Sequence, residues 1–131
     1  MIGLDTNVLV RYIMQDDVKQ ATRASKLIEA LSPSSMGFIT IISIVELCWV
    51  LESAFDLSRA QIVEVLQHLT AVEVFKIDRV SIVAAAVRAY SDGKAGLADY
   101  LIERLCAQAG CEQTMTFDKA AAKSAGMILI D

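Results

Sequence analysis

The sequence has little of several residue types that mark particular classes of protein. Its 131 residues include one proline, one histidine, six glycines and three cysteines. So few prolines and glycines argue against a linker or low-complexity tract, and a hydrophobic fraction of 55% excludes a disordered chain. A single histidine, His68, without paired cysteines excludes the usual tetrahedral zinc site. We therefore expect one folded domain over residues 1–131, without zinc.

Long hydrophobic runs are also missing. The longest apolar stretch, residues 38–45, ends at Glu46 and is far shorter than the roughly 20 apolar residues that span a bilayer. No secretory signal pattern follows Met1. The cysteines lack C-x-x-C spacing, and their odd number argues against a disulfide framework. These absences predict a protein of the reducing cytoplasm with no membrane span.

Positive charge is in the minority, since the formal net charge is −4. This balance disfavours nucleic-acid binding unless the acidic residues hold a metal ion. One basic stripe stands out, because Lys19, Arg23 and Lys26 recur at i, i+4 and i+7 on one helical face. A solvated helix face explains this stripe, and so does contact with a phosphate backbone. We take these residues and Arg11 as candidate RNA contacts.

Short apolar runs alternate with longer helical patterns along the whole chain. This alternation is typical of an α/β fold with a parallel sheet covered by helices. Ser58 followed by Gln61 predicts a capping box at the start of one helix, and Gly110 and Gly126 are typical C-terminal stops of two others. The predicted strands are residues 2–5, 37–40, 72–75, 113–116 and 127–130.

Four carboxylates, Asp5, Glu46, Asp99 and Asp118, lie in or beside segments that otherwise read as core. An unpaired carboxylate removed from water loses several kcal/mol, so such placement suggests a cation partner. Each has a structural alternative except Glu46: Asp5 and Asp118 precede helices as N-caps, and Asp99 lies in a first helical turn. The segment 42–55 is apolar on nearly every face, which predicts a buried helix with Glu46 pointing inward.

Clustered carboxylates predict a particular chemistry. They suit Mg²⁺ or Mn²⁺, which prefer oxygen ligands and keep waters that a substrate phosphate can displace. Such an ion polarises a phosphoryl oxygen and activates water, so phosphodiester hydrolysis is the natural reaction. Phosphate-binding loops and nucleophile elbows are absent. A phosphatase acting on small molecules is a rival hypothesis.

Four motifs resemble those of the PIN domain and, within that superfamily, of the VapC toxins. They are D-T-N-V-L-V-R at Asp5–Arg11, S-I-V-E at Ser43–Glu46, A-D-Y-L-I at Ala98–Ile102 and T-F-D at Thr116–Asp118. The likeness covers essentially the whole chain, with the motifs in family order. It implies a PIN-like three-layer sandwich with a central, mostly parallel sheet of four or five strands flanked by helices.

The resemblance also implies a function. It describes a Mg²⁺- or Mn²⁺-dependent endoribonuclease that acts as the toxin of a toxin–antitoxin pair, commonly as a homodimer. The resemblance further implies a small VapB-like antitoxin that occupies a groove by the active site. A PIN fold that has weak catalysis and acts by binding RNA or a partner protein is the alternative. By this resemblance the four acids correspond to the catalytic and metal-binding residues, with Asp5 and Asp99 in direct contact with the metal. Asn7 and Thr116 match positions that orient the acids, and we expect Thr6 to help in the same way.

Two positions depart from the family pattern. Many relatives carry an acidic residue and then Phe where this chain has Gly96 and Leu97. We expect the missing carboxylate to weaken a second metal. Val18 stands where proline is frequent, which touches only a loop. Neither departure removes one of the four acids.

Overall fold

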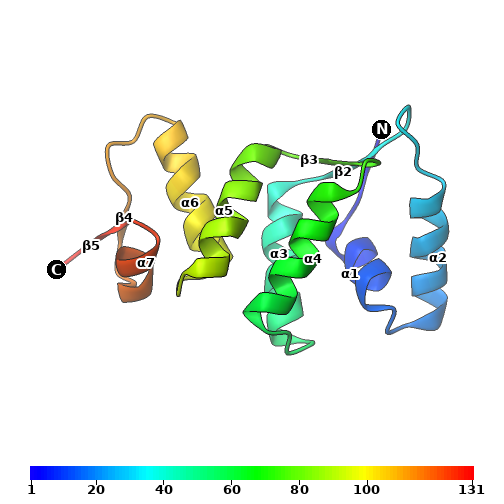
Figure 1. Cartoon of the computed structure of the whole chain (residues 1–131), viewed down its shortest axis with the longest axis horizontal. Helices are drawn as coiled ribbons and strands as arrows, with labels where there is room; N and C mark the ends of the chain where they lie inside the picture. Colours follow the sequence, from blue (N-terminus) through cyan, green and yellow to red (C-terminus); the bar gives the residue numbers. More distant parts are fainter. The chain divides into compact units, whose positions relative to one another are not determined.

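The computed structural model describes all 131 residues, which form two compact units, Met1–Val80 and Ser81–Asp131 (Figure 1). Both units contain helices and strands that pair in parallel. The predicted α/β class with parallel strands is therefore confirmed, and the prediction of a single domain stays a prediction. None of the helices is both long and apolar enough to span a bilayer.

The first unit is built on a three-stranded parallel sheet in the order β1-β2-β3. Its strands are β1 (Ile2–Gly3), β2 (Gly37–Ile39) and β3 (Phe75–Ile77). Strands β1 and β2 lie within their predicted ranges, but the prediction of a strand at residues 72–75 was wrong in its bounds. Val72 ends the preceding helix and accepts a hydrogen bond from the N–H of Phe75, so the chain turns before it pairs.

Four helices complete the first unit: α1 (Thr6–Met14), α2 (Val18–Glu29), α3 (Ile41–Ser53) and α4 (Arg59–Ala71). A side-chain oxygen of Asp5, Asp17, Thr40 or Ser58 accepts a backbone N–H at each N-terminus, and the predicted capping box of Ser58 is present. Helix α1 packs against α2 and α3, and α3 packs against α4. The fully buried side chains of this unit include Leu9, Ile39, Ile44, Leu47, Leu51, Ile62, Leu66 and Leu69.

Helix α3 is present as predicted, but only one of its faces is buried. Ile44, Leu47 and Leu51 are at most 1% exposed, whereas Trp49 is 67% exposed. Glu46 is exposed as well, so the prediction that it points into the protein was wrong. An apolar pattern on all sides gives the packing no single direction, and the face that the neighbouring helices cover is the one without Glu46.

The second unit joins helices to a two-stranded parallel sheet. Its elements are α5 (Val80–Asp92), which begins at the last residue of the first unit, α6 (Leu97–Gln108), β4 (Met115–Thr116), α7 (Lys119–Ser124) and β5 (Ile128–Leu129). Helix α7 is the crossover between β4 and β5 and contacts both. Gly110 and Gly126 follow α6 and α7 with φ angles of 99° and 76°, as their predicted stop role requires.

Candidate functional site

Asp5 stands where the chain leaves β1 and enters α1. Its backbone is extended, with φ −75° and ψ 158°, and it is the N-cap of the helix. The Oδ1 atom accepts a hydrogen bond of 2.9 Å from the N–H of Thr6. The side chain is exposed, so the carboxylate lies at a helix N-terminus in contact with solvent. The N-cap alternative for Asp5 is confirmed, and it leaves the second carboxylate oxygen open to another partner.

Thr6 joins this carboxylate to Glu46. The Thr6 hydroxyl donates a hydrogen bond of 2.9 Å to Oε1 of Glu46, while its N–H serves Asp5. Thr6 is one of two buried polar residues of the chain, at 6% exposure, so its position is fixed by packing. Helices α1 and α3 are thereby linked at one residue, and two acids 41 positions apart (46 − 5) meet there.

No cation of the protein neutralises this pair of acids. Arg11 pairs with Asp16 and Arg79 with Asp78, and no ion pair includes Asp5 or Glu46. Two carboxylates held on one residue without Lys or Arg repel each other, and a divalent cation would relieve that repulsion. Their donor set is all oxygen, which fits Mg²⁺ or Mn²⁺ and not a soft metal.

The second unit holds the other two predicted acids. Asp99 lies in the first turn of α6 and is partly exposed, and its Oδ2 atom accepts a 3.1 Å hydrogen bond from the N–H of Gly96. Asp118 is the exposed N-cap of α7, and its Oδ1 atom accepts the N–H groups of residues 120 and 121 at 2.7 and 3.1 Å. Thr116 accepts the backbone N–H of Asp118 at 3.0 Å. Thr116 therefore acts on the backbone of Asp118.

The structure thus groups the predicted acids by unit, Asp5 with Glu46 and Asp99 with Asp118. Neither unit by itself gathers three or more His, Cys, Asp or Glu side chains able to hold a metal ion. The helix-terminal alternatives for Asp99 and Asp118 are confirmed, as for Asp5. The side chain of Asn7 is exposed and makes no hydrogen bond, so its predicted orienting role stays a prediction.

A polar cluster of the second unit, Ser81–Asp131, was not predicted from the sequence. The hydroxyls of Tyr100 and Ser124 lie 2.7 Å apart, and each accepts a backbone N–H from the loop that precedes α6. No local pattern predicts this contact, because the partners are 24 residues apart in the chain. The one available signal was that Tyr100 directly follows Asp99.

The predicted basic residues divide into two kinds. Lys19, Arg23 and Lys26 are exposed along α2 and have no ion-pair partner. Arg11 already has partners within the protein, since its guanidinium donates hydrogen bonds to both carboxylate oxygens of Asp16 and to the side chain of Gln20. The stripe on α2 is therefore available to an anion, while the charge of Arg11 is already compensated.

A groove runs between α1 and α2, with a volume of about 280 Å³. Its apolar lining comes from Val8, Ala24 and Leu27. Its polar lining comes from Asn7, Arg11, Gln20 and Arg23. Asn7, in the first turn of α1, places one end of the groove at the N-terminal turn of that helix.

Comparison with known families gives one clear match. The family model described as PIN domain matches residues 2–126. No curated protein matches the sequence significantly. PIN domains are typically nucleases that act on RNA, and they generally bind divalent metals.

Proposed function

We propose, since the chain belongs to the PIN-domain family, that it is an endoribonuclease dependent on Mg²⁺ or Mn²⁺ and the toxin of a toxin–antitoxin pair. The observation that carries the proposal is the convergence of Asp5 and Glu46 on Thr6, without a cationic side chain. Hydrogen bonds donated by Thr6 hold both carboxylates in place before any substrate arrives. This is the preorganisation that a binding site for a hard dication requires.

The proposed metal ligands are Asp5, Glu46, Asp99 and Asp118, with direct contact from Asp5 and Asp99. A bound dication supplies polarisation of the scissile phosphate and a water with a lowered pKa. The residues of the chain do the rest. Thr6 fixes the Glu46 carboxylate, and Glu46 or Asp118 accepts a hydrogen bond from the attacking water. Cleavage of the P–O bond leaves one phosphate end and one hydroxyl end on the RNA.

Asp5→Asn tests this proposal. Asparagine keeps the N-cap hydrogen bond to Thr6, because Asn and Asp are equally good N-caps, but it removes the charge. We expect RNA cleavage and growth arrest to be abolished at unchanged thermal stability. Asp17→Asn is the matched control, since Asp17 is also a helix N-cap, accepts the N–H of Gln20 in α2 and lies outside the proposed ligand set. Cleavage by Asp5→Asn at the wild-type rate would overturn the metal-dependent mechanism.

The same assay separates the rival functions. Equal growth arrest by the wild-type protein and by Asp5→Asn would favour a PIN fold that acts by binding. Hydrolysis of a generic phosphate ester with no cleavage of structured RNA would favour a phosphatase. The nuclease proposal requires RNA cleavage that depends on both Asp5 and an added dication.

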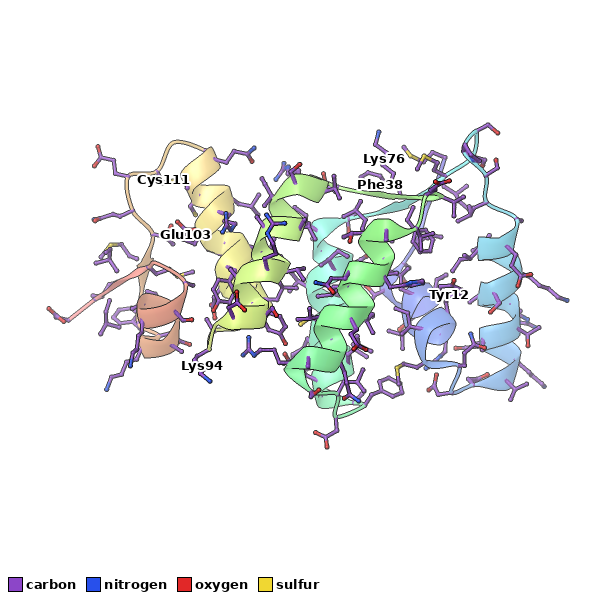
Figure 2. All side chains as sticks on the ribbon, viewed as in Figure 1. Tyr12, Phe38, Lys76, Lys94, Glu103 and Cys111 are labelled. Atoms are coloured by element: carbon purple, nitrogen blue, oxygen red, sulfur yellow. The ribbon has the colours of Figure 1, made fainter.

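Contact with the RNA backbone is assigned to the basic stripe on α2. Charge reversal at Arg23 and Lys26 should weaken RNA binding and reduce its salt dependence, because fewer counterions are released. Lys76→Glu on β3 is the control, since Lys76 is exposed on another element of the same unit (Figure 2). Binding that is unchanged by reversal on α2 would remove the stripe from the interface.

The antitoxin is assigned to the groove between α1 and α2. Its apolar lining and the unpaired guanidinium of Arg23 suit a segment with apolar side chains and a carboxylate. An antitoxin bound there would occupy Arg23, which is also a proposed RNA contact. Inhibition would then follow from competition for one cation, and Arg23→Glu should weaken the antitoxin complex.

We further propose a homodimer in the cytoplasm. All three cysteines are free, which suits a reducing compartment. On α3, Ile42 and Trp49 are 72% and 67% exposed, an apolar surface of the kind that subunit interfaces cover. Light scattering on the full chain measures the mass directly, and a monomer at micromolar concentration would contradict the dimer.

A further inference from the structure

A pair of hydroxyl groups, one on α6 and one on α7, lies between these two helices. Oη of Tyr100 and Oγ of Ser124 are 2.7 Å apart. Ser124 accepts the N–H of Lys94 at 2.9 Å, and Tyr100 accepts the N–H of Ala95 at 3.3 Å. Lys94 contributes only its backbone, since its side chain is exposed and points away from the ribbon (Figure 2). The two hydroxyls thus fasten the loop that leads into α6.

Gly93 shows how closely the loop approaches these oxygens. A Cβ atom at this position would lie 1.7 Å from Oη of Tyr100 and 2.7 Å from Oγ of Ser124. No side chain fits at these distances without displacing Tyr100 or Ser124. Glycine is therefore needed at residue 93 for the two hydroxyls to reach the loop.

The loop that these hydroxyls bind and helix α7 each have one of the acids at one end. The loop closes at Gly96, whose N–H donates to the Asp99 carboxylate. Ser124 is the last residue of α7, and Asp118 is the N-cap of that helix. The helix is a single rigid piece of about 9 Å at 1.5 Å per residue. Fixing Ser124 to the loop therefore fixes Asp118 relative to Asp99.

We propose that Tyr100 and Ser124 are positioning residues that set the separation of the metal ligands Asp99 and Asp118, an inference that rests on the proposed metal-dependent function. Neither hydroxyl touches metal or substrate. They act through the backbone of residues 94–96 and through α7, and Gly93 allows the contact. Loss of either hydroxyl leaves both carboxylates present but places them less accurately, so metal affinity falls.

Mn²⁺ affinity of the full chain, measured by titration calorimetry without RNA, tests the proposal. Tyr100→Phe keeps the ring of a side chain that is only 4% exposed, and Ser124→Ala removes a single oxygen. We expect each to weaken Mn²⁺ binding about tenfold, the lower end of the range for residues that orient metal ligands. Cleavage should recover at saturating Mn²⁺, because the ligands themselves remain.

Ser53→Ala is the control, because the Ser53 hydroxyl bonds only to the carbonyl of Trp49 within its own helix. Ser124→Thr keeps a hydroxyl and should restore part of the affinity lost in Ser124→Ala. If Tyr100→Phe and Ser124→Ala lower the melting temperature but bind Mn²⁺ as tightly as the wild type, the two residues are merely structural and the inference is wrong.

The wild type and Asp99→Asn show which of the two proposals has failed. Wild-type binding of Mn²⁺ that Asp99→Asn abolishes, together with unaltered binding by Tyr100→Phe, would overturn the positioning role alone. A wild-type protein that binds no Mn²⁺ would overturn the metal-dependent function and this inference with it.

Discussion

At the scale of single residues, three of the four proposed metal ligands already have a task in the free protein. Asp5 and Asp118 cap helices, and Asp99 accepts a backbone N–H at the start of α6. A carboxylate at a helix N-terminus is stabilised by about 0.3–1 kcal/mol through the helix dipole. Glu46 has no such compensation in the middle of α3, and its one hydrogen bond comes from Thr6. Of the four proposed ligands, Glu46 therefore has the least stabilised negative charge when no metal is bound.

Thr6→Val tests this dependence. Valine matches the shape of threonine but cannot donate to Glu46, so the carboxylate should lose its fixed position. We expect Mn²⁺ affinity to fall about tenfold, with a change of about 1 kcal/mol or less in the free energy of unfolding. Titration calorimetry and thermal unfolding measure the two effects. Thr6→Ser, which keeps the hydroxyl, should bind like the wild type, and equal affinity of the Val and Ser variants would contradict the role of the hydroxyl.

A substitution at Gly96 should raise the affinity of the protein for Mn²⁺. Its φ of −76° suits any residue, and an added Cβ would lie 3.6 Å from Oδ2 of Asp99, an ordinary contact. Gly96→Asp places a second carboxylate beside Asp99, and attraction to a dication a few ångströms away adds on the order of 1–2 kcal/mol. We expect Mn²⁺ binding about tenfold tighter than in Gly96→Asn, which caps the helix equally well without charge. Equal affinity of the two variants would exclude residue 96 from the metal environment.

At the scale of secondary-structure elements, α7 is followed by a residue with a left-handed backbone. Gly126 has φ 76°, and a Cβ there would meet no atom within 4 Å. Gly126→Ala therefore isolates the backbone cost, and it should lower the free energy of unfolding by about 1–2 kcal/mol. Gly3→Ala is the control, because Gly3 also has open space but no positive φ. Urea unfolding that gave equal stabilities would show that α7 is not terminated by this residue.

Helix ends were the most predictable elements of this fold. The signals at Ser58, Gly110 and Gly126 are local, since each depends on the hydrogen bonds of a few neighbouring residues. Strand β3 was misplaced because Val72, a typical strand residue, instead ends α4. The orientation of α3 was wrong for a different reason, because the burial of Glu46 depends on which face other elements cover, and no local pattern contains that information.

At the scale of the whole molecule, residue type and motif were enough to propose the four acids. They did not predict the contacts that those acids make. Thr6 was expected only to orient the acids, whereas the structure makes it the link between Asp5 and Glu46. The contact between Tyr100 and Ser124 was invisible in the sequence. The contacts of Thr6 with Glu46 and of Tyr100 with Ser124 join residues far apart along the chain, so they exist only once the helices have packed.

Binding of Mn²⁺ should stabilise the folded chain as a whole. At a free concentration of 100 times the dissociation constant, the gain is about 2.7 kcal/mol. If all four acids are ligands, amide hydrogen exchange should slow in both compact units, Met1–Val80 and Ser81–Asp131. Asp99→Asn should then remove the effect of Mn²⁺ on the first unit, although residue 99 belongs to the second. Protection confined to one unit would contradict a shared site.

Trp49 is the only tryptophan of the chain, and it stands one turn beyond Glu46 on the uncovered side of α3. Its indole emission therefore comes from a single known place, and in the isolated protein that emission should be red-shifted by contact with water. A paramagnetic ion at Glu46 should quench it, and a partner that covers α3 should shift it to the blue. The exposed indole thus provides an optical signal that needs no label and distinguishes metal binding from subunit association in one cuvette.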